Sequence, residues 1–193
     1  MSSLPPLRKK TVDGKLYKRR AATEILIHKC LELTFDELCD RAEISARTHD
    51  DYIPSEVLVY FLRQTKTHNN DAQFGSLYQL LEKRIRRVCP HSKVRLGEKE
   101  GTIGHLQDVQ DFVLDDFAVR VMRDRQEYEE KLDIFEYAFD KAVARRKHDA
   151  MRVMYQRDKP TEPLQYDEDG DIPADVEGAL SKLNPNKNSH EDE

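Results

Sequence analysis

The chain has 193 residues, of which 38% are hydrophobic and 36% are charged, and its mean hydropathy is −0.81. This length fits one domain of ordinary size with tails, or at most two small domains. No apolar run approaches the roughly 20 residues needed to cross a bilayer, and residues 1–10 hold no apolar signal core. We therefore expect a polar surface over a modest core, and no membrane among the partners.

The cysteines and the acidic residues argue against a metal site or an active site. Cys30, Cys39 and Cys89 form an odd set without a CxxC spacing, so a reduced, cytoplasmic setting fits best. Their spacing to nearby histidines matches no closed zinc set. No glycine-rich phosphate loop or nucleophile motif occurs, and the carboxylates follow helix surfaces. We expect no catalytic residue, no metal, no cofactor and no enzymatic activity.

The net charge of −5 is distributed unevenly along the chain. Residues 1–20 hold seven basic residues and one acidic residue, whereas residues 159–193 hold ten acidic and three basic residues. We expect a flexible basic leader at 1–20, an N-terminal helical extension at 21–50, a helical domain at 51–158 and an acidic, largely disordered tail at 159–193. The leader is either solvated or touches DNA. The tail either solubilises the chain or competes with nucleic acid for a basic surface.

Between these ends, the apolar spacing of almost every periodic segment is helical. The spacing predicts helices over residues 21–44, 54–64, 72–88, 108–124 and 132–156. The candidate N-cap of the second helix is Ser55, and the third helix ends before Pro90. A loop is expected at residues 91–106, which contain three glycines. No segment alternates enough to demand a sheet, so the predicted fold class is an all-α bundle.

The stretch DVQDFVLDDFAVRVMRD, residues 108–124, combines five aspartates with an apolar helical face. At about 100° per residue, Asp108, Asp111 and Asp115 share a narrow arc beside that face. This arc is either a solvated surface favoured by the helix dipole or a docking surface for a basic partner. We also expect Asp116 to form an i,i+4 ion pair with Arg120, which contributes about a few tenths of a kcal/mol.

The last predicted helix carries a complementary basic arc. Four residues, Lys141, Arg145, His148 and Arg152, fall within about 60° of one another on the helical wheel. Such an arc suits nucleic-acid phosphates, although solvation alone also accounts for it. A neighbouring side chain, Arg146, projects into the apolar arc and has to find an acidic partner.

The order of these features resembles region two of bacterial RNA polymerase sigma factors, particularly the extracytoplasmic-function type. Family members typically read like DAEDLVQEVFLRLWRD in the acidic helix and like FRAWLYRIARNLALDRLR in the last helix. The matching positions are Asp108, Asp111, Asp115 (for Glu), Phe117 and Arg120 in the first motif, and Phe135, Asp149, Met151 (for Leu) and Arg152 in the second. The resemblance covers residues 52–155.

The resemblance implies a sigma-like transcription initiation factor, built as a compact helical bundle with extra N-terminal helices. Its acidic helix would bind the clamp coiled coil of the largest subunit of bacterial core RNA polymerase. The implied polymerase-binding residues are Asp108, Asp111, Asp115 and Asp116. The connection after this helix and the last helix would contact single-stranded promoter DNA. The implied DNA-binding residues are Arg123, Arg125, Tyr128, Lys141, Arg145 and Arg152.

Departures from the family pattern keep a second hypothesis open. The family frequently has Gln at the position of Leu114, and aromatic residues at the positions of Ala138 and Asp140. The proline-punctuated acidic residues 158–193 leave no room for the helix-turn-helix domain that reads the minus-thirty-five element. The alternative is a sigma-like interaction or regulatory module. It would bind polymerase, or an inhibitory or recruiting protein, without recognising a promoter.

A third hypothesis is an unrelated helical scaffold or DNA-binding module whose resemblance to sigma factors is accidental. The predicted helices around Leu77, Val109 and Phe139 are the ones that the resemblance places together. If these three helices did not pack on one another, this hypothesis would be favoured.

Overall fold

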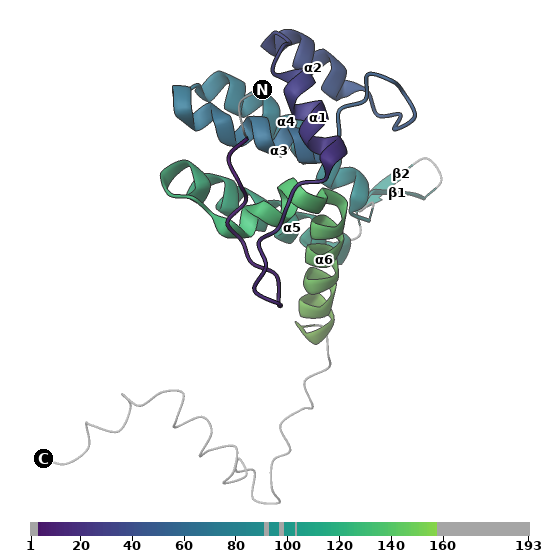
Figure 1. The fold of residues 1–193 in the computed structure, drawn as a ribbon. Coiled ribbons are helices and arrows are strands. Elements are labelled where there is room, and N and C mark those ends of the chain that lie inside the picture. The colour runs from purple at the N-terminus through teal and green to yellow at the C-terminus, as the bar shows by residue number, and fades with distance from the viewer. Residues whose placement is uncertain (1–3, 91–92, 97–98, 103, 158–193) are drawn as a thin grey trace, which may run out of the picture. The chain divides into compact units, whose positions relative to one another are not determined.

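A computed structural model of the chain describes residues 4–90, 93–96, 99–102 and 104–157, so the predicted acidic tail lies outside the described residues. The all-α fold class is confirmed. The α-helices are α1 (Ala21–Cys30), α2 (Phe35–Glu43), α3 (Ser55–Gln64), α4 (Asp71–Val88), α5 (Gly104–Gln126) and α6 (Asp133–Arg157) (Figure 1). Two 3-10 helices, η1 (Thr65–His68) and η2 (Glu130–Leu132), follow α3 and precede α6. Among the described residues, none of these helices has the length and apolar character to cross a bilayer.

The single helix predicted over residues 21–44 is wrong, because the chain breaks there between α1 and α2. A capping box starts the second helix. The Thr34 hydroxyl accepts a hydrogen bond from the Glu37 amide at 3.3 Å, and the Glu37 carboxylate accepts one from the Thr34 amide at 2.8 Å. Reciprocal capping of this kind satisfies two amides that a helix start otherwise leaves without partners. The Thr-x-x-Glu pattern was therefore the signal for this break.

The loop predicted at residues 91–106 contains a short hairpin. Strands β1 (Lys93–Leu96) and β2 (Lys99–Thr102) pair in antiparallel fashion, and α5 already begins at Gly104. Four-residue strands carry too little alternation to be recognised by periodicity.

The early start of α5 leaves its first turn without an acidic residue. The helix dipole acts mainly within the first turn, so it does not account for Asp108 and Asp111.

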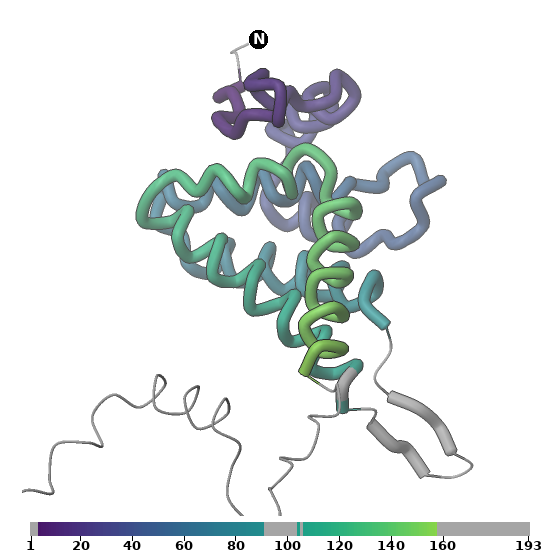
Figure 2. Tube along the Cα trace, turned by 90° about the horizontal axis from the view of Figure 1, so that it is seen from below, coloured from purple at the N-terminus to yellow at the C-terminus, as the bar shows by residue number. Residues whose placement is uncertain are grey.

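The core is centred on aromatic rings from α4, α5 and α6. The fully buried Phe117 of α5 lies 5.2 Å from Phe135 and 6.2 Å from Phe139, measured between ring centroids. Both partners belong to α6, and Leu77 of α4 and Val109 of α5 join the same core. Figure 2 shows α4 and α5 side by side with α6 against them, which agrees with their contacts. The three helices therefore pack together. The separation of these helices that would have favoured an accidental resemblance is not observed.

The described part of the basic segment before α1, residues 4–20, packs against the body, whereas we expected a flexible leader at residues 1–20. We call residues 4–20 the strap; Figure 1 shows it in dark purple. Its Leu7 is 2% exposed, and the backbone amides of Arg8 and Lys9 donate to Asp133 at 2.7 and 2.8 Å. A strap ring, Tyr17, meets Tyr137 edge-on at 5.0 Å. Two strap amides thus donate to a buried carboxylate, a contact that charge patterning along the chain cannot reveal.

A kink divides α6 near its beginning. The backbone of Ala138 has φ −155° and ψ 74°, which are not helical values. The interruption frees the amide of Phe139 from the regular ladder, and that amide donates to the Glu56 carboxylate at 3.0 Å. Because Glu56 belongs to the first turn of α3, the longer part of α6 is capped from a neighbouring helix.

Candidate functional site

Three carboxylates of α5 form an exposed surface that we call the acidic stripe: Asp108, Asp111 and Asp115. No ion pair joins any of the three to another described residue. The Asp111 carboxylate accepts a hydrogen bond from the Gln107 side chain at 2.9 Å. A full set of unneutralised carboxylates on one face attracts a cationic surface.

Exposed apolar side chains continue the acidic stripe toward the end of α5. The exposed fractions of Val119 and Met122 are 48% and 56%. At about 100° per residue, both fall on the same helical arc as the carboxylates. Exposed apolar groups next to charged ones are typical of protein–protein interfaces, in which the apolar groups contribute buried area and the charges fix the orientation.

The fourth predicted polymerase contact, Asp116, is committed to internal ion pairs. Its carboxylate accepts two hydrogen bonds from Arg120, both at 2.7 Å, and lies 3.2 Å from the guanidinium of Arg146. The expected i,i+4 pair is therefore confirmed, and Arg146 has found the acidic partner that its position required. We exclude Asp116 from the acidic stripe, because breaking these pairs would leave Arg120, which is 8% exposed, without its partner.

The cations predicted on the last helix lie on one exposed arc of α6, which we call the basic strip: Lys141, Arg145 and Arg152. The first two make no hydrogen bond or ion pair with other described residues, and Arg152 lies 4.0 Å from Asp149. The exposed His148 falls on the same arc. An exposed row of cations spaced along a helix can meet successive phosphates of a nucleic-acid strand.

Two of the three residues predicted to bind DNA from the connection after α5 are engaged elsewhere. The guanidinium of Arg125 pairs with Asp71 at 2.5 Å and lies 4.4 Å from the ring centroid of Phe74. The hydroxyl of Tyr128 donates to Asp133 at 2.6 Å. Only Arg123 is exposed and without such partners among the described residues. DNA contact by Tyr128 and Arg125 stays a prediction, and it would have to compete with these internal partners.

Arginines of the protein itself contact the ring of Tyr128 and would compete with a stacking base. The guanidinium carbons of Arg8 and Arg63 each lie 4.3 Å from its ring centroid. Burial and the hydrogen bond to Asp133 raise the pKa of Tyr128 to about 12, so its hydroxyl stays a donor at ordinary pH. Its ring is a platform for arginines of the protein itself.

Beneath the strap lies a set of buried charges that sequence patterns missed, and we call it the buried ion cluster. Its acidic members are Asp124, Asp133 and Glu136, and its basic members are Arg19, Arg63 and Lys66. The cluster joins the strap to α3, η1, α5 and α6. The three negative and three positive charges sum to zero, and a buried group of charges is tolerated only when its charges are paired in this way.

The guanidinium of Arg63 is the centre of the buried ion cluster. It donates to Asp124 at 2.8 Å, to Asp133 at 2.7 Å and to Glu136 at 2.8 Å. The fully buried Asp133 carboxylate accepts four hydrogen bonds in total, from Arg63, Tyr128 and the two strap amides. This saturation makes the burial of an ionised carboxylate tolerable.

A signal for the buried ion cluster was present in the sequence. Glu136 lies at helical spacing between the apolar residues Leu132 and Phe139, and Arg63 follows Val59 by four positions. A charged residue at an apolar-face position must find a buried partner. From the sequence, an acidic partner was predicted in this way for Arg146 alone.

All three cysteines are free in the structure. The thiols of Cys30 and Cys89 are buried, Cys39 is partly buried, and none forms a disulfide. Burial raises the pKa of all three. Within the described part of the chain, no group of three or more His, Cys, Asp or Glu side chains could hold a metal ion.

Comparison with known proteins gives no match: no protein-family model fits the chain, and no curated protein or solved structure is significantly similar to it.

The buried ion cluster predicts a large loss of stability when one carboxylate is removed. We expect Asp133→Asn to lower the free energy of unfolding by about 3 kcal/mol, because Arg63 loses a buried counter-charge. Urea denaturation followed by circular dichroism measures this change. The matched control is Glu43→Gln, which breaks the exposed pair with Lys83 and should change stability by less than about 1 kcal/mol. Equal effects of the two substitutions would contradict this prediction.

The cluster also predicts how acid destabilises the protein. Burial opposes ionisation of Asp124, but hydrogen bonds and the charge of Arg63 outweigh it and lower the pKa of Asp124 below its ordinary value. Its stabilising effect is therefore complete above about pH 4 and is lost as the pH falls toward the lowered pKa. We expect Asp124→Asn to flatten the fall in stability below about pH 4 relative to the unsubstituted chain. The exposed control Asp50→Asn should leave the slope unchanged in urea unfolding at several pH values.

Proposed function

We propose that this chain is a sigma-like transcription initiation factor that binds bacterial core RNA polymerase through the acidic stripe of α5. The basic strip of α6 then contacts single-stranded promoter DNA. The proposal assigns binding roles only and no catalytic residue. It rests on the resemblance in the order and spacing of the two helix motifs, together with the exposure of the residues that would bind.

The observation that carries the proposal is the state of the acidic stripe. The described part of the chain has many ion pairs that engage carboxylates, including all three acids of the buried ion cluster. By contrast, Asp108, Asp111 and Asp115 are exposed and form none with other described residues. Three unpaired carboxylates on one helix face leave their charge available to a partner. A basic helical hairpin, such as the polymerase clamp coiled coil, has the complementary charge.

Support for DNA contact comes from the basic strip, with Arg123 as a further candidate on α5. Strand separation costs about a few kcal/mol for each base removed from the duplex, and base stacking or pocket contacts must compensate. The exposed cations of α6 can supply phosphate contacts. Stacking on Tyr128 is excluded from the proposal, because its ring already contacts two arginines.

A second candidate function is a sigma-like module that binds polymerase or a regulatory protein without promoter recognition. Specific observations favour it: Tyr128 is not free to stack, Tyr137 contacts the strap ring Tyr17, and Ala138 lies at the kink of α6. Runoff transcription with purified core polymerase separates the two candidates. Activity on duplex promoters supports initiation, whereas activity on an unwound template alone supports the second candidate.

Charge reversal in the acidic stripe tests polymerase binding. We expect Asp111→Arg combined with Asp115→Arg to abolish co-purification with core polymerase, because two attractive charges become repulsive. The control reverses two exposed acids elsewhere, Glu32→Arg and Asp50→Arg, and should retain the polymerase. Circular dichroism verifies that both variants fold. Undiminished binding by the stripe variant would remove the proposed function.

Charge reversal in the basic strip tests DNA contact. We expect Lys141→Glu combined with Arg145→Glu to weaken binding of a single-stranded oligonucleotide, measured by fluorescence anisotropy. The slope of log affinity against log salt should fall by about 1.4 if two phosphate contacts are lost. Reversal of two other exposed lysines, Lys29→Glu and Lys131→Glu, is the control and should leave the slope unchanged. Equal slopes for both double variants would exclude the strip as the DNA contact.

A further inference from the structure

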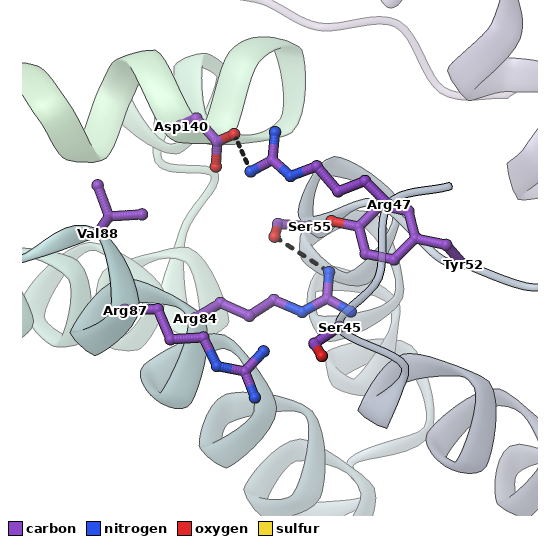
Figure 3. A pocket seen from close by; sticks show the side chains of 8 residues that line it. All are labelled: Ser45, Arg47, Tyr52, Ser55, Arg84, Arg87, Val88 and Asp140. Carbon is purple, nitrogen blue, oxygen red and sulfur yellow. Dashed lines mark hydrogen bonds and ion pairs between the residues drawn. The ribbon is translucent and has the colours of Figure 1, made fainter. Parts of the chain in front are cut away.

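A cavity of about 360 Å³ lies where the segment between α2 and α3 meets α3, α4 and α6, and we call it the arginine cavity. Figure 3 shows the residues that line it: Ser45, Arg47, Tyr52, Ser55, Arg84, Arg87, Val88 and Asp140. The lining therefore contains three arginines and one carboxylate. This feature goes beyond the proposed function, because none of these residues belongs to the acidic stripe or the basic strip.

The guanidinium of Arg84 is buried without a carboxylate partner among the described residues. The side chain is 8% exposed, and it donates to the backbone oxygens of Ile53 and Ala42, each at 2.7 Å, and to the Ser55 hydroxyl at 3.1 Å. All three acceptors are neutral, so they fix the group in place but leave its charge uncompensated. Burial consequently lowers the pKa of Arg84, although arginine remains protonated. A buried charge held in this way is favourable to an anion in the cavity.

The other two guanidinium groups are available at the mouth of the arginine cavity. The Arg87 side chain is exposed and makes no hydrogen bond or ion pair with another described residue. Arg47 pairs with Asp140 at 2.5 Å, but both side chains are largely solvent-accessible, at 68% and 46%. Exposed pairs of this kind contribute little stability. An incoming anion can therefore compete with Asp140 for Arg47.

The start of α3 adds a further positive contribution. The sequence predicted Ser55 as the N-cap, but Pro54 holds that position and no side chain caps the helix. Ser55 is the first helical residue, and its hydroxyl accepts from Arg84 instead. The first amides of an uncapped helix carry partial positive charge and bind anions. Since Ser55 lines the cavity, this helix end reinforces the field of the arginines.

We propose that the arginine cavity binds a phosphate group. A phosphate offers several acceptor oxygens to planar guanidinium donors, which bind it in bidentate fashion. A volume of about 360 Å³ exceeds the needs of an inorganic ion and suits a phosphate attached to a larger group. The ligand class is a phosphorylated small molecule such as a mononucleotide; the same chemistry also fits a phosphate of a nucleic-acid strand.

Isothermal titration calorimetry on the full chain tests the site, with four probes: inorganic phosphate, adenosine monophosphate, adenosine and a single-stranded oligonucleotide. We expect the two phosphate-bearing small molecules to bind and adenosine not to bind. The substitutions Arg87→Gln and Arg47→Gln should each weaken binding by about tenfold, since each removes charge-assisted hydrogen bonds to the ligand. Both side chains are exposed, so the variants should fold, which circular dichroism verifies.

Two further variants make the test specific. The matched control Arg86→Gln alters the neighbouring arginine, which is exposed but pairs with Glu82 and does not line the cavity, so affinity should be unchanged. In the opposite direction, Asp140→Asn should tighten phosphate binding severalfold, because it removes the carboxylate that competes for Arg47.

The probes distinguish the sources of the phosphate. Binding of adenosine monophosphate that depends on Arg87 and Arg47 supports a small phosphorylated ligand. Oligonucleotide binding with the same dependence, and no binding of the small probes, supports a strand phosphate as the occupant. The absence of binding by every probe, or binding that neither arginine affects, would overturn the proposal. Such a failure would leave the proposed function intact, because that function is tested by charge reversal on α5 and α6.

Discussion

The structure depends on the buried carboxylate of Asp133. Its four hydrogen bonds connect the strap, the end of α3 and the connection after α5 to the first residue of α6. Such a group is stable only when every acceptor position is used, because an ionised carboxylate loses its hydration on burial. The strap amides and Arg63 are therefore requirements of the fold. The aromatic core supplies the hydrophobic stabilisation, whereas this carboxylate determines how the segments around it are joined.

Internal pairing separates the charges that stabilise the fold from those that remain available. The buried ion cluster and the pairs of Asp116 engage carboxylates and cations within the fold. The charges that remain exposed include a short acidic face on α5 and a basic arc on α6. The kink in α6 contributes to this arrangement. Glu56 of α3 accepts a hydrogen bond from the Phe139 amide just after the kink. This contact with α3 helps to orient the part of α6 that carries the basic strip.

The long helices could be predicted from the sequence, because α4, α5 and α6 repeat their apolar residues over many turns. The break before α2 was missed although Thr34 and Glu37 carry the capping pattern, and the hairpin was missed because its strands are short. For the candidate site, the exposure of the acidic stripe and of the basic strip followed from helical geometry. The pair of Asp116 with Arg120 of its own helix was predicted. The contact of Asp116 with Arg146 and the arginines around Tyr128 were not, because these partners come from other elements that only tertiary structure brings close.

The strap has a consequence for how the chain folds. Its amides bond to a carboxylate 124 and 125 positions later, which are among the longest separations in the molecule. Closing so long a loop is entropically costly before other contacts exist, so contacts of this range form late. During synthesis, the strap would thus remain unpaired until α6 emerges from the ribosome. The strap is made before its partner carboxylate and can be fixed in place only after it.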